Sequence, residues 1–169
     1  MTSNNRRILI IDDNRAIHED FTKILGPAET PNSNLSAFED ELFGETAAVP
    51  VKEGFEISSA FQGQDALEMV LAGETEGRPF AMAFVDVRMP PGWDGVETIS
   101  RIWEASRNLQ TVICTAYSDY SWEQIIERLG KNDRLLILRK PFDPVEVQQL
   151  ACNLTEKWSK LQQPVAAVS

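Results

Sequence analysis

Short runs of apolar residues alternate along the chain with longer segments whose apolar residues recur every three or four positions. The first run, Ile8 to Ile11, contains no polar residue, as expected for a parallel strand that is covered on both faces. Four similar runs follow at intervals. The sequence therefore predicts five strands, at residues 8–11, 55–61, 80–87, 111–116 and 135–138.

The segments that follow the first two strands have helical spacing. Gly26 followed by Pro27 ends the first helix, and the second helix is expected at residues 64–72, closed by Gly73. We expect these helices to bury Ile17, Phe21, Ile24 and Leu25 in the first, and Ala66, Leu67, Val70 and Leu71 in the second.

Capping residues mark the start of each later helix. Asp94 and Ser121 each precede an apolar stripe, and each has Glu or Gln three positions later, which is the capping-box pattern. Asp143 followed by Pro144 begins the last helix, because proline is favoured at the first helical position.

Strict alternation of strands and helices predicts an α/β fold with a doubly wound parallel sheet and helices on both faces. In such sheets, ligands bind beyond the carboxyl ends of the strands. The residues that carry chemistry are therefore expected where the strands end.

Two segments depart from this alternation. Residues 28–53 contain two prolines and little helical period, and we interpret them as a surface insertion between the first helix and the second strand. The insertion has six acidic residues and one lysine, which is −5 of the formal net charge of −10. We expect one domain over residues 1–163 and a tail or severed linker at 164–169.

The acidic composition, with a net charge of −10, disfavours two classes of partner. Nucleic acids and anionic lipids both require basic residues, so we expect neither as a direct partner. No apolar run has the length of a membrane span or a signal-peptide core, which indicates a cytoplasmic protein. Cys114 and Cys152 lie in apolar patterns and are interpreted as buried thiols.

Polar residues lie at the carboxyl ends of four of the predicted strands, in order. Asp12 and Asp13 follow the first, Asp86 lies in the third, Thr115 in the fourth, and Lys140 follows the fifth. Three crowded carboxylates raise one another's pKa unless a cation lies among them, and Mg²⁺ is the natural cation for oxygen ligands. Asp86 is the candidate nucleophile. Each residue alone has a simpler interpretation, as a helix cap, a strand residue or a solvated charge, so the prediction rests on their joint appearance.

These residues lie in motifs that resemble the receiver domains of bacterial response regulators: Ile-Leu-Ile-Ile-Asp-Asp at 8–13, Phe-Val-Asp-Val-Arg-Met-Pro at 84–90, Ile-Cys-Thr-Ala at 113–116 and Leu-Arg-Lys-Pro-Phe at 138–142. The resemblance covers nearly the whole chain apart from the insertion and the tail. It implies a (βα)₅ flavodoxin-like fold with strand order 2-1-3-4-5.

The resemblance also implies the function. Asp86 would take a phosphoryl group from a histidine kinase or a phosphotransfer protein in a Mg²⁺-dependent reaction of two-component signalling. It implies these site residues: Asp13, Asp86 and the backbone carbonyl of Arg88 as metal ligands, Asp12 as a ligand through water, Thr115, Lys140 and the Ala116 backbone N–H for the phosphoryl group, and a cis bond before Pro141. Such a domain assists its own phosphorylation but is not a turnover enzyme.

The chain departs from the family pattern at two places near the site. The loop at residues 89–95 is about one residue longer than usual, and Ile137 stands where the family often has the tyrosine or phenylalanine that moves with the threonine. A degenerate receiver that acts as a phosphorylation-independent interaction module therefore stays as the alternative. An aspartate-nucleophile phosphatase would need an acid where Arg88 stands, and a nucleotide-binding module would need a glycine-rich loop.

Two helices carry further expectations. His18, the only histidine, does not belong to the Ile17–Phe21–Ile24 stripe and is expected at the surface. The last helix has apolar residues at 4-3-4-3 spacing, which suits packing on the sheet, a dimer seam or continuation into an output domain. Its apolar residues are Val147, Ala151, Leu154, Trp158 and Leu161. We expect phosphorylation to move the surface formed by residues 121–130, the fifth strand and the last helix.

Overall fold

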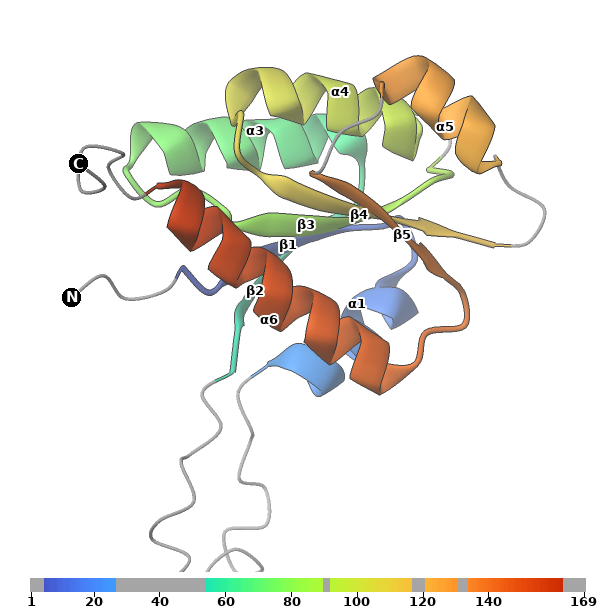
Figure 1. Ribbon diagram of the computed structural model, residues 1–169, viewed down its shortest axis with the longest axis horizontal. Helices are drawn as coiled ribbons and strands as arrows, with labels where there is room; N and C mark the ends of the chain where they lie inside the picture. Colours follow the sequence, from blue (N-terminus) through green and yellow to red (C-terminus); the bar gives the residue numbers. More distant parts are fainter. Residues whose placement is uncertain (1–4, 27–53, 90–91, 117–120, 131–133, 163–169) are drawn as a thin grey trace, which may run out of the picture.

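The computed structural model describes residues 5–26, 54–89, 92–116, 121–130 and 134–162. Within them, five strands form one parallel sheet in the order β2-β1-β3-β4-β5 (Figure 1). The strands are β1 (Arg7–Ile11), β2 (Glu56–Ala60), β3 (Met82–Asp86), β4 (Gln110–Thr115) and β5 (Leu135–Arg139). The helices are α1 (Arg15–Leu25), α3 (Gly63–Thr75), α4 (Gly95–Ala105), α5 (Trp122–Leu129) and α6 (Pro144–Leu161). The predicted fold class and strand order are confirmed.

The sheet separates two hydrophobic layers. Helices α1 and α6 cover one face, and α3, α4 and α5 cover the other (Figure 1). Successive residues of β1 point to opposite faces, so Ile8 and Ile10 pack with the α1–α6 layer while Leu9 and Ile11 pack with the α3–α5 layer. Covering on both faces explains why β1 and β3 are apolar over most of their length.

The helix starts largely follow the sequence. Ser121 and Gln124 form both halves of the predicted capping box, and Asp143 caps α6 with Pro144 in its first turn. Asp94 caps α4 as predicted, because its side chain accepts a hydrogen bond from the Glu97 backbone N–H at 2.8 Å. The Glu97 carboxylate accepts from Arg101, four residues on.

The predicted end and buried face of α3 are partly wrong. The helix passes through Gly73 and continues to Thr75. A Cβ atom at Gly73 would lie 2.7 Å from the Arg78 carbonyl oxygen, so glycine permits a close backbone approach at this point. Leu71 is 47% exposed, because α3 packs through Ala66 and Val70.

Helix α1 presents a different stripe from the one predicted. Its buried residues are His18, Phe21 and Leu25, whereas Ile17 and Ile24 are half-buried. The surface position expected for His18 is therefore wrong. Cys152 was also expected inside and is exposed, while Cys114 is buried.

The last helix uses most of its apolar stripe within the domain. Val147, Ala151 and Leu154 are buried against the sheet, Trp158 is half-buried, and Leu161 is exposed. Packing on the sheet thus accounts for the first three residues.

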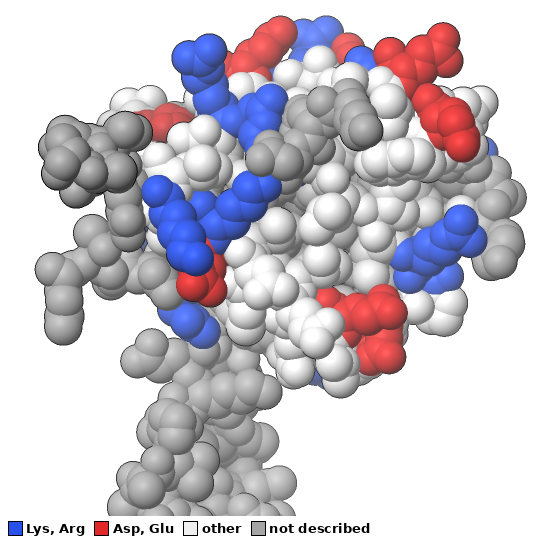
Figure 2. Space-filling model, in the orientation of Figure 1, with Lys and Arg blue, Asp and Glu red and all other residues white. Residues whose placement is uncertain are grey.

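One face of the molecule has a broad area without charged side chains. On this face, shown in Figure 2, basic and acidic side chains lie mostly around the edge of that area. Among the residues that the structure describes, no helix combines the length and the apolar character that crossing a membrane requires. The predicted insertion at 28–53, the tail at 164–169, and Pro90 and Pro91 of the loop at 89–95 lie outside the described residues.

Candidate functional site

The predicted acidic residues meet at the carboxyl edge of the sheet. Asp12 and Asp13 directly follow β1, and Asp86 is the last residue of the neighbouring strand β3. One carboxylate oxygen from each of these three residues lies within 4.8 Å of the others. The side chains of Asp12 and Asp86 are buried, whereas Asp13 is exposed.

Lys140 follows the edge strand β5, and its side chain extends toward the acidic residues. Its Nζ lies 3.0 Å from Oδ1 of Asp86 and 3.5 Å from Oδ2 of Asp12. With all groups ionised, three carboxylates and one ammonium leave a formal charge of −2. The cluster therefore lacks two positive charges.

A divalent cation with hard oxygen ligands fits this arrangement. Carboxylate oxygens within 4.8 Å of one another can bind a single ion, and Mg²⁺ binds through one or two carboxylates while retaining waters. The charge of such an ion matches the deficit. The residues that are present thus suit the cofactor that the sequence implied.

Burial and charge shift the pKa values of the site. Burial raises the pKa of Asp86, and the hydrogen bond from Lys140 offsets only part of this rise. Burial likewise raises the pKa of Asp12, against the hydrogen bond from the Asn14 backbone N–H. For Lys140, burial lowers the pKa, but the hydrogen bond to Asp86 and the charge of Asp12 outweigh it, so the pKa is raised. The buried carboxylates thus ionise less readily than usual, and the ammonium is held in its charged form.

The remaining predicted residues lie around this cluster. Asp86 pairs with Cys114 across the sheet, so Thr115 lies one residue further toward the same edge. The Lys140 backbone N–H donates to the Thr115 carbonyl at 2.9 Å, which joins the ends of β4 and β5. Arg88 and Ala116 lie in the segments that follow β3 and β4. The Lys140–Pro141 peptide bond is cis.

Two neighbouring positions shape the surroundings of Asp86. A Cβ atom at Gly95 would clash with the Asp86 carbonyl oxygen, so a glycine lets α4 begin directly beside the end of β3. Ile137, at the position where the family often has an aromatic residue, is half-buried and packs on the core of the α3–α5 layer.

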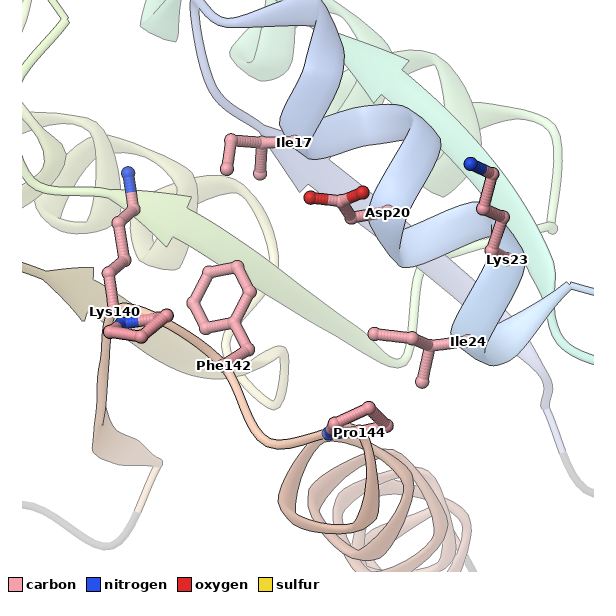
Figure 3. Close-up of a pocket in the computed structure, with 8 residues that line it drawn as sticks. Ile17, Asp20, Lys23, Ile24, Lys140, Phe142 and Pro144 are labelled. Atoms are coloured by element: carbon pink, nitrogen blue, oxygen red, sulfur yellow. The ribbon is translucent and has the colours of Figure 1, made fainter.

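A groove of about 630 Å³ opens next to Lys140. It lies between α1 and the segment that joins β5 to α6, and Figure 3 shows the side chains of both walls around it. Most of its exposed surface is apolar. Its walls are formed by Ile17, Asp20, Lys23, Ile24, Lys140, Pro141, Phe142 and Pro144. An apolar partner surface placed here would reach the site from the α1 side.

His18 is the site-proximal residue that the sequence interpretation missed. Its Nε2 lies 2.7 Å from the Asp12 carbonyl oxygen, and its Nδ1 lies 2.9 Å from the Ser59 hydroxyl. Burial lowers the pKa of His18, so the imidazole is held neutral. The available signal was the i, i+3, i+7 spacing of His18, Phe21 and Leu25, which passes through a polar residue.

Comparisons with known proteins agree with this fold. The family model of the response regulator receiver domain matches residues 41–151. Sporulation initiation phosphotransferase F of Bacillus subtilis (strain 168) is 33% identical over 97 residues, which cover 57% of this chain and 71% of that protein.

Solved structures share the fold at lower identity. A CheY-like response regulator receiver domain protein from Methanospirillum hungatei JF-1 has a TM-score of 0.62 and 19% identity, covering 92% of this chain and 97% of that one. The REC domain of AraT, a response regulator from Geobacillus stearothermophilus, has a TM-score of 0.63 and 23% identity, covering 94% and 99%.

The parallel sheet with its acidic edge and lysine defines a signalling receiver domain of the flavodoxin-like class. The chain belongs to the response regulator receiver domain family of two-component systems.

Proposed function

We propose that Asp86 accepts a phosphoryl group in a two-component phosphorelay. The observation that carries the proposal is the cluster itself, in which three carboxylates lie within 4.8 Å of one another and Lys140 lies 3.0 Å from Asp86. Phosphoryl transfer needs mainly positioning and charge neutralisation, and such a cluster supplies both.

In the proposed reaction, a carboxylate oxygen of Asp86 attacks the phosphorus atom of a phosphohistidine. An O–P bond forms, the N–P bond breaks, and the imidazole of the donor leaves with the electron pair of that bond. Lys140 balances charge on the phosphoryl oxygens, while Thr115 and the Ala116 backbone N–H donate hydrogen bonds to them. Mg²⁺, when bound, neutralises phosphoryl charge, and its ligands would be Asp13, Asp86, the Arg88 carbonyl and, through water, Asp12.

The phosphodonor is a histidine kinase or a phosphotransfer protein. The groove supports this partner, because Ile24, Phe142 and Pro144 offer apolar surface in a groove that Lys140 also lines. A protein that contacts this groove would bring its phosphohistidine to the edge of the sheet. We expect the reaction to take place in the cytoplasm, where ATP-dependent kinases act.

Phosphorylation then changes the contacts of Thr115 and Lys140. It adds a charge of roughly −1.5 to −2. Two charge-assisted hydrogen bonds at about 1.5–3 kcal/mol each would supply roughly 3–6 kcal/mol. Reversing a 1:99 equilibrium takes about 5.5 kcal/mol, so the switch has little margin. The moving surface would comprise α5, β5 and α6, which lie next to these residues. The exposed Leu161 of α6 is a candidate contact for a second copy or an output domain.

The first test is chemical. The protein is incubated with acetyl phosphate and Mg²⁺, and its intact mass is measured. We expect one labile phosphoryl group per chain, absent from Asp86→Asn and strongly reduced by EDTA. A matched control, Asp65→Asn in the exposed first turn of α3, is expected to be labelled like the wild type.

Each outcome has a distinct meaning. Phosphorylation that persists in Asp86→Asn would place the acceptor elsewhere. A folded wild-type protein that takes no phosphoryl group from acetyl phosphate or from phosphorylated kinase would favour the alternative, a degenerate receiver that acts as an interaction module. Repeated turnover of the phosphodonor at a rate far above the decay of the adduct would contradict the view that the domain is not a turnover enzyme.

A further inference from the structure

The buried imidazole of His18 connects two segments of the chain beside the acidic cluster. It projects from α1, with Nε2 at 2.7 Å from the Asp12 carbonyl oxygen and Nδ1 at 2.9 Å from the Ser59 hydroxyl on β2. The side chain is 5% exposed, and its ring packs against Phe61 with 4.4 Å between ring centroids. A polar ring held this closely has a fixed orientation.

The partners of the ring determine its tautomer. A backbone carbonyl can only accept a hydrogen bond, so Nε2 carries the hydrogen and donates to Asp12. In a neutral imidazole Nδ1 is then the acceptor, and the Ser59 hydroxyl donates to it. Burial, which lowers the pKa of His18, agrees with the neutral ring.

The Asp12 carbonyl belongs to the peptide unit that joins Asp12 to Asp13. The Asp12 side chain has other restraints: Oδ1 accepts from the Asn14 backbone N–H at 2.8 Å, and Oδ2 lies 3.5 Å from Lys140 Nζ. Among the described residues, the Asp13 side chain forms no hydrogen bond or ion pair. The direction of the Asp13 carboxylate therefore depends on the orientation of the backbone that carries it.

We propose that His18 is a positioning residue for the cation site, which fixes the Asp12–Asp13 peptide through the hydrogen bond from Nε2 and thereby aims the Asp13 carboxylate at the ion. The inference rests on the proposed function, since it takes this cluster to be a Mg²⁺ site. It assigns a role to a buried group that the phosphoryl-transfer chemistry does not use. Residues that orient metal ligands typically change metal affinity 10–100-fold when they are replaced.

The test compares two amide substitutions that retain different halves of the imidazole. His18→Gln can place its amide nitrogen near the position of Nε2, whereas the shorter His18→Asn reaches only toward Nδ1. Mg²⁺ is titrated into each folded protein, without phosphodonor, and the dissociation constant is measured from backbone amide NMR shifts. We expect His18→Asn to weaken Mg²⁺ binding about 10-fold or more, and His18→Gln to stay within about threefold of the wild type.

Ser59→Ala is the matched control, because it removes the partner of the other ring nitrogen and leaves the Nε2 donor in place. We expect its Mg²⁺ affinity to stay within about threefold of the wild type. Equal affinity in His18→Asn and wild type would overturn the inference, and so would an equal loss in Ser59→Ala and His18→Asn.

A measurement on the wild type covers the case in which His18→Asn does not fold. The ¹⁵N shifts of the ring at pH 7.5 report its tautomer, and we expect a hydrogen on Nε2 alone. A ring protonated only at Nδ1 could not donate to Asp12 and would overturn the inference. Failure of the proposed function is distinguishable, because the wild type itself would then show no saturable Mg²⁺ binding.

Discussion

The residues of the cluster place charge where the fold tolerates it poorly. Asp12 and Asp86 are 2% and 7% exposed, and burial raises the pKa of both. A raised carboxyl pKa means that ionisation is less favourable in the folded chain than in the unfolded one. At neutral pH these groups therefore reduce the stability of the metal-free protein, and this cost shrinks as the pH falls through the raised pKa values.

Replacing Asp86 by asparagine should stabilise the metal-free protein. The substitution keeps an acceptor for Lys140 and removes one of three crowded negative charges. In EDTA at pH 7.5 we expect Tm to rise by roughly 2–4 °C, the shift that about 1 kcal/mol produces in a chain of this size. Thermal unfolding followed by circular dichroism measures this. Glu104→Gln, which removes an exposed charge from α4, should change Tm by no more than about 1 °C; an Asp86→Asn protein that melts at or below the wild-type temperature contradicts the argument.

The two thiols should differ sharply in reactivity. Cys114 is buried in β4, and burial raises the pKa of its thiol, whereas Cys152 is exposed on α6. Because the thiolate is the reactive form, N-ethylmaleimide should add once to the native protein and twice to the denatured one, as counted by intact mass. Cys152→Ser should accept no label while folded. Native labelling of that variant at a comparable rate would show that β4 is accessible.

The sequence predicted where the helices lie better than it predicted which of their residues are buried. The apolar stripe of α1 was assigned to Ile17, Phe21 and Ile24, yet the helix buries His18, Phe21 and Leu25. Both stripes satisfy helical spacing, and the packing of α1 on the sheet and against α6 selects one of them. The polar partners of His18 come from distant parts of the chain, so no local pattern could reveal that the histidine is buried.

Gly73 shows how a local rule fails when another segment passes close by. Glycine after an apolar stripe usually ends a helix, but α3 continues to Thr75 because Gly73 leaves room for the Arg78 carbonyl. The contact lies outside any helical pattern and depends on how the chain leaves α3. The cap residues Ser121 and Asp143, whose hydrogen bonds are local, were predicted correctly.

Substituting alanine at Gly73 should destabilise the protein, although alanine is the better helix former by about 1 kcal/mol. The added Cβ would lie 2.7 Å from a backbone oxygen, which cannot move without shifting the chain. We expect a loss of roughly 1–3 kcal/mol in the free energy of unfolding, measured by urea titration. Leu71→Ala, at an exposed position in the same helix, should lie within about 1 kcal/mol of the wild type. A Gly73→Ala protein more stable than wild type would show that the backbone relaxes.

At the scale of the whole molecule, the alternation of strands and helices sufficed to predict the sheet and the edge at which chemistry would gather. Asp12, Asp86, Thr115 and Lys140 were placed together because parallel strands share one carboxyl edge. Distances within the cluster were beyond prediction, since the approach of Lys140 to Asp86 depends on the path of the chain after β5. The consequence of Ile137 was equally hidden, because its packing against the α3–α5 layer depends on contacts between elements.

Cation binding should therefore stabilise the molecule as a whole, because the ligands come from separate strands and the ion binds only when they are brought together. At a Mg²⁺ concentration of about 100 times the dissociation constant, mass action supplies about 2.7 kcal/mol. We expect the Tm of the wild type to rise with MgCl₂ by more than with NaCl of equal ionic strength, in a scan followed by circular dichroism. Asp13→Asn should lose most of this difference, whereas Asp65→Asn, on α3 and outside the cluster, should retain it. Equal responses to the two salts in the wild type would mean that salt only screens the three carboxylates and that no Mg²⁺ ion is bound. Without that ion, Lys140 alone would have to balance the charge of an incoming phosphoryl group.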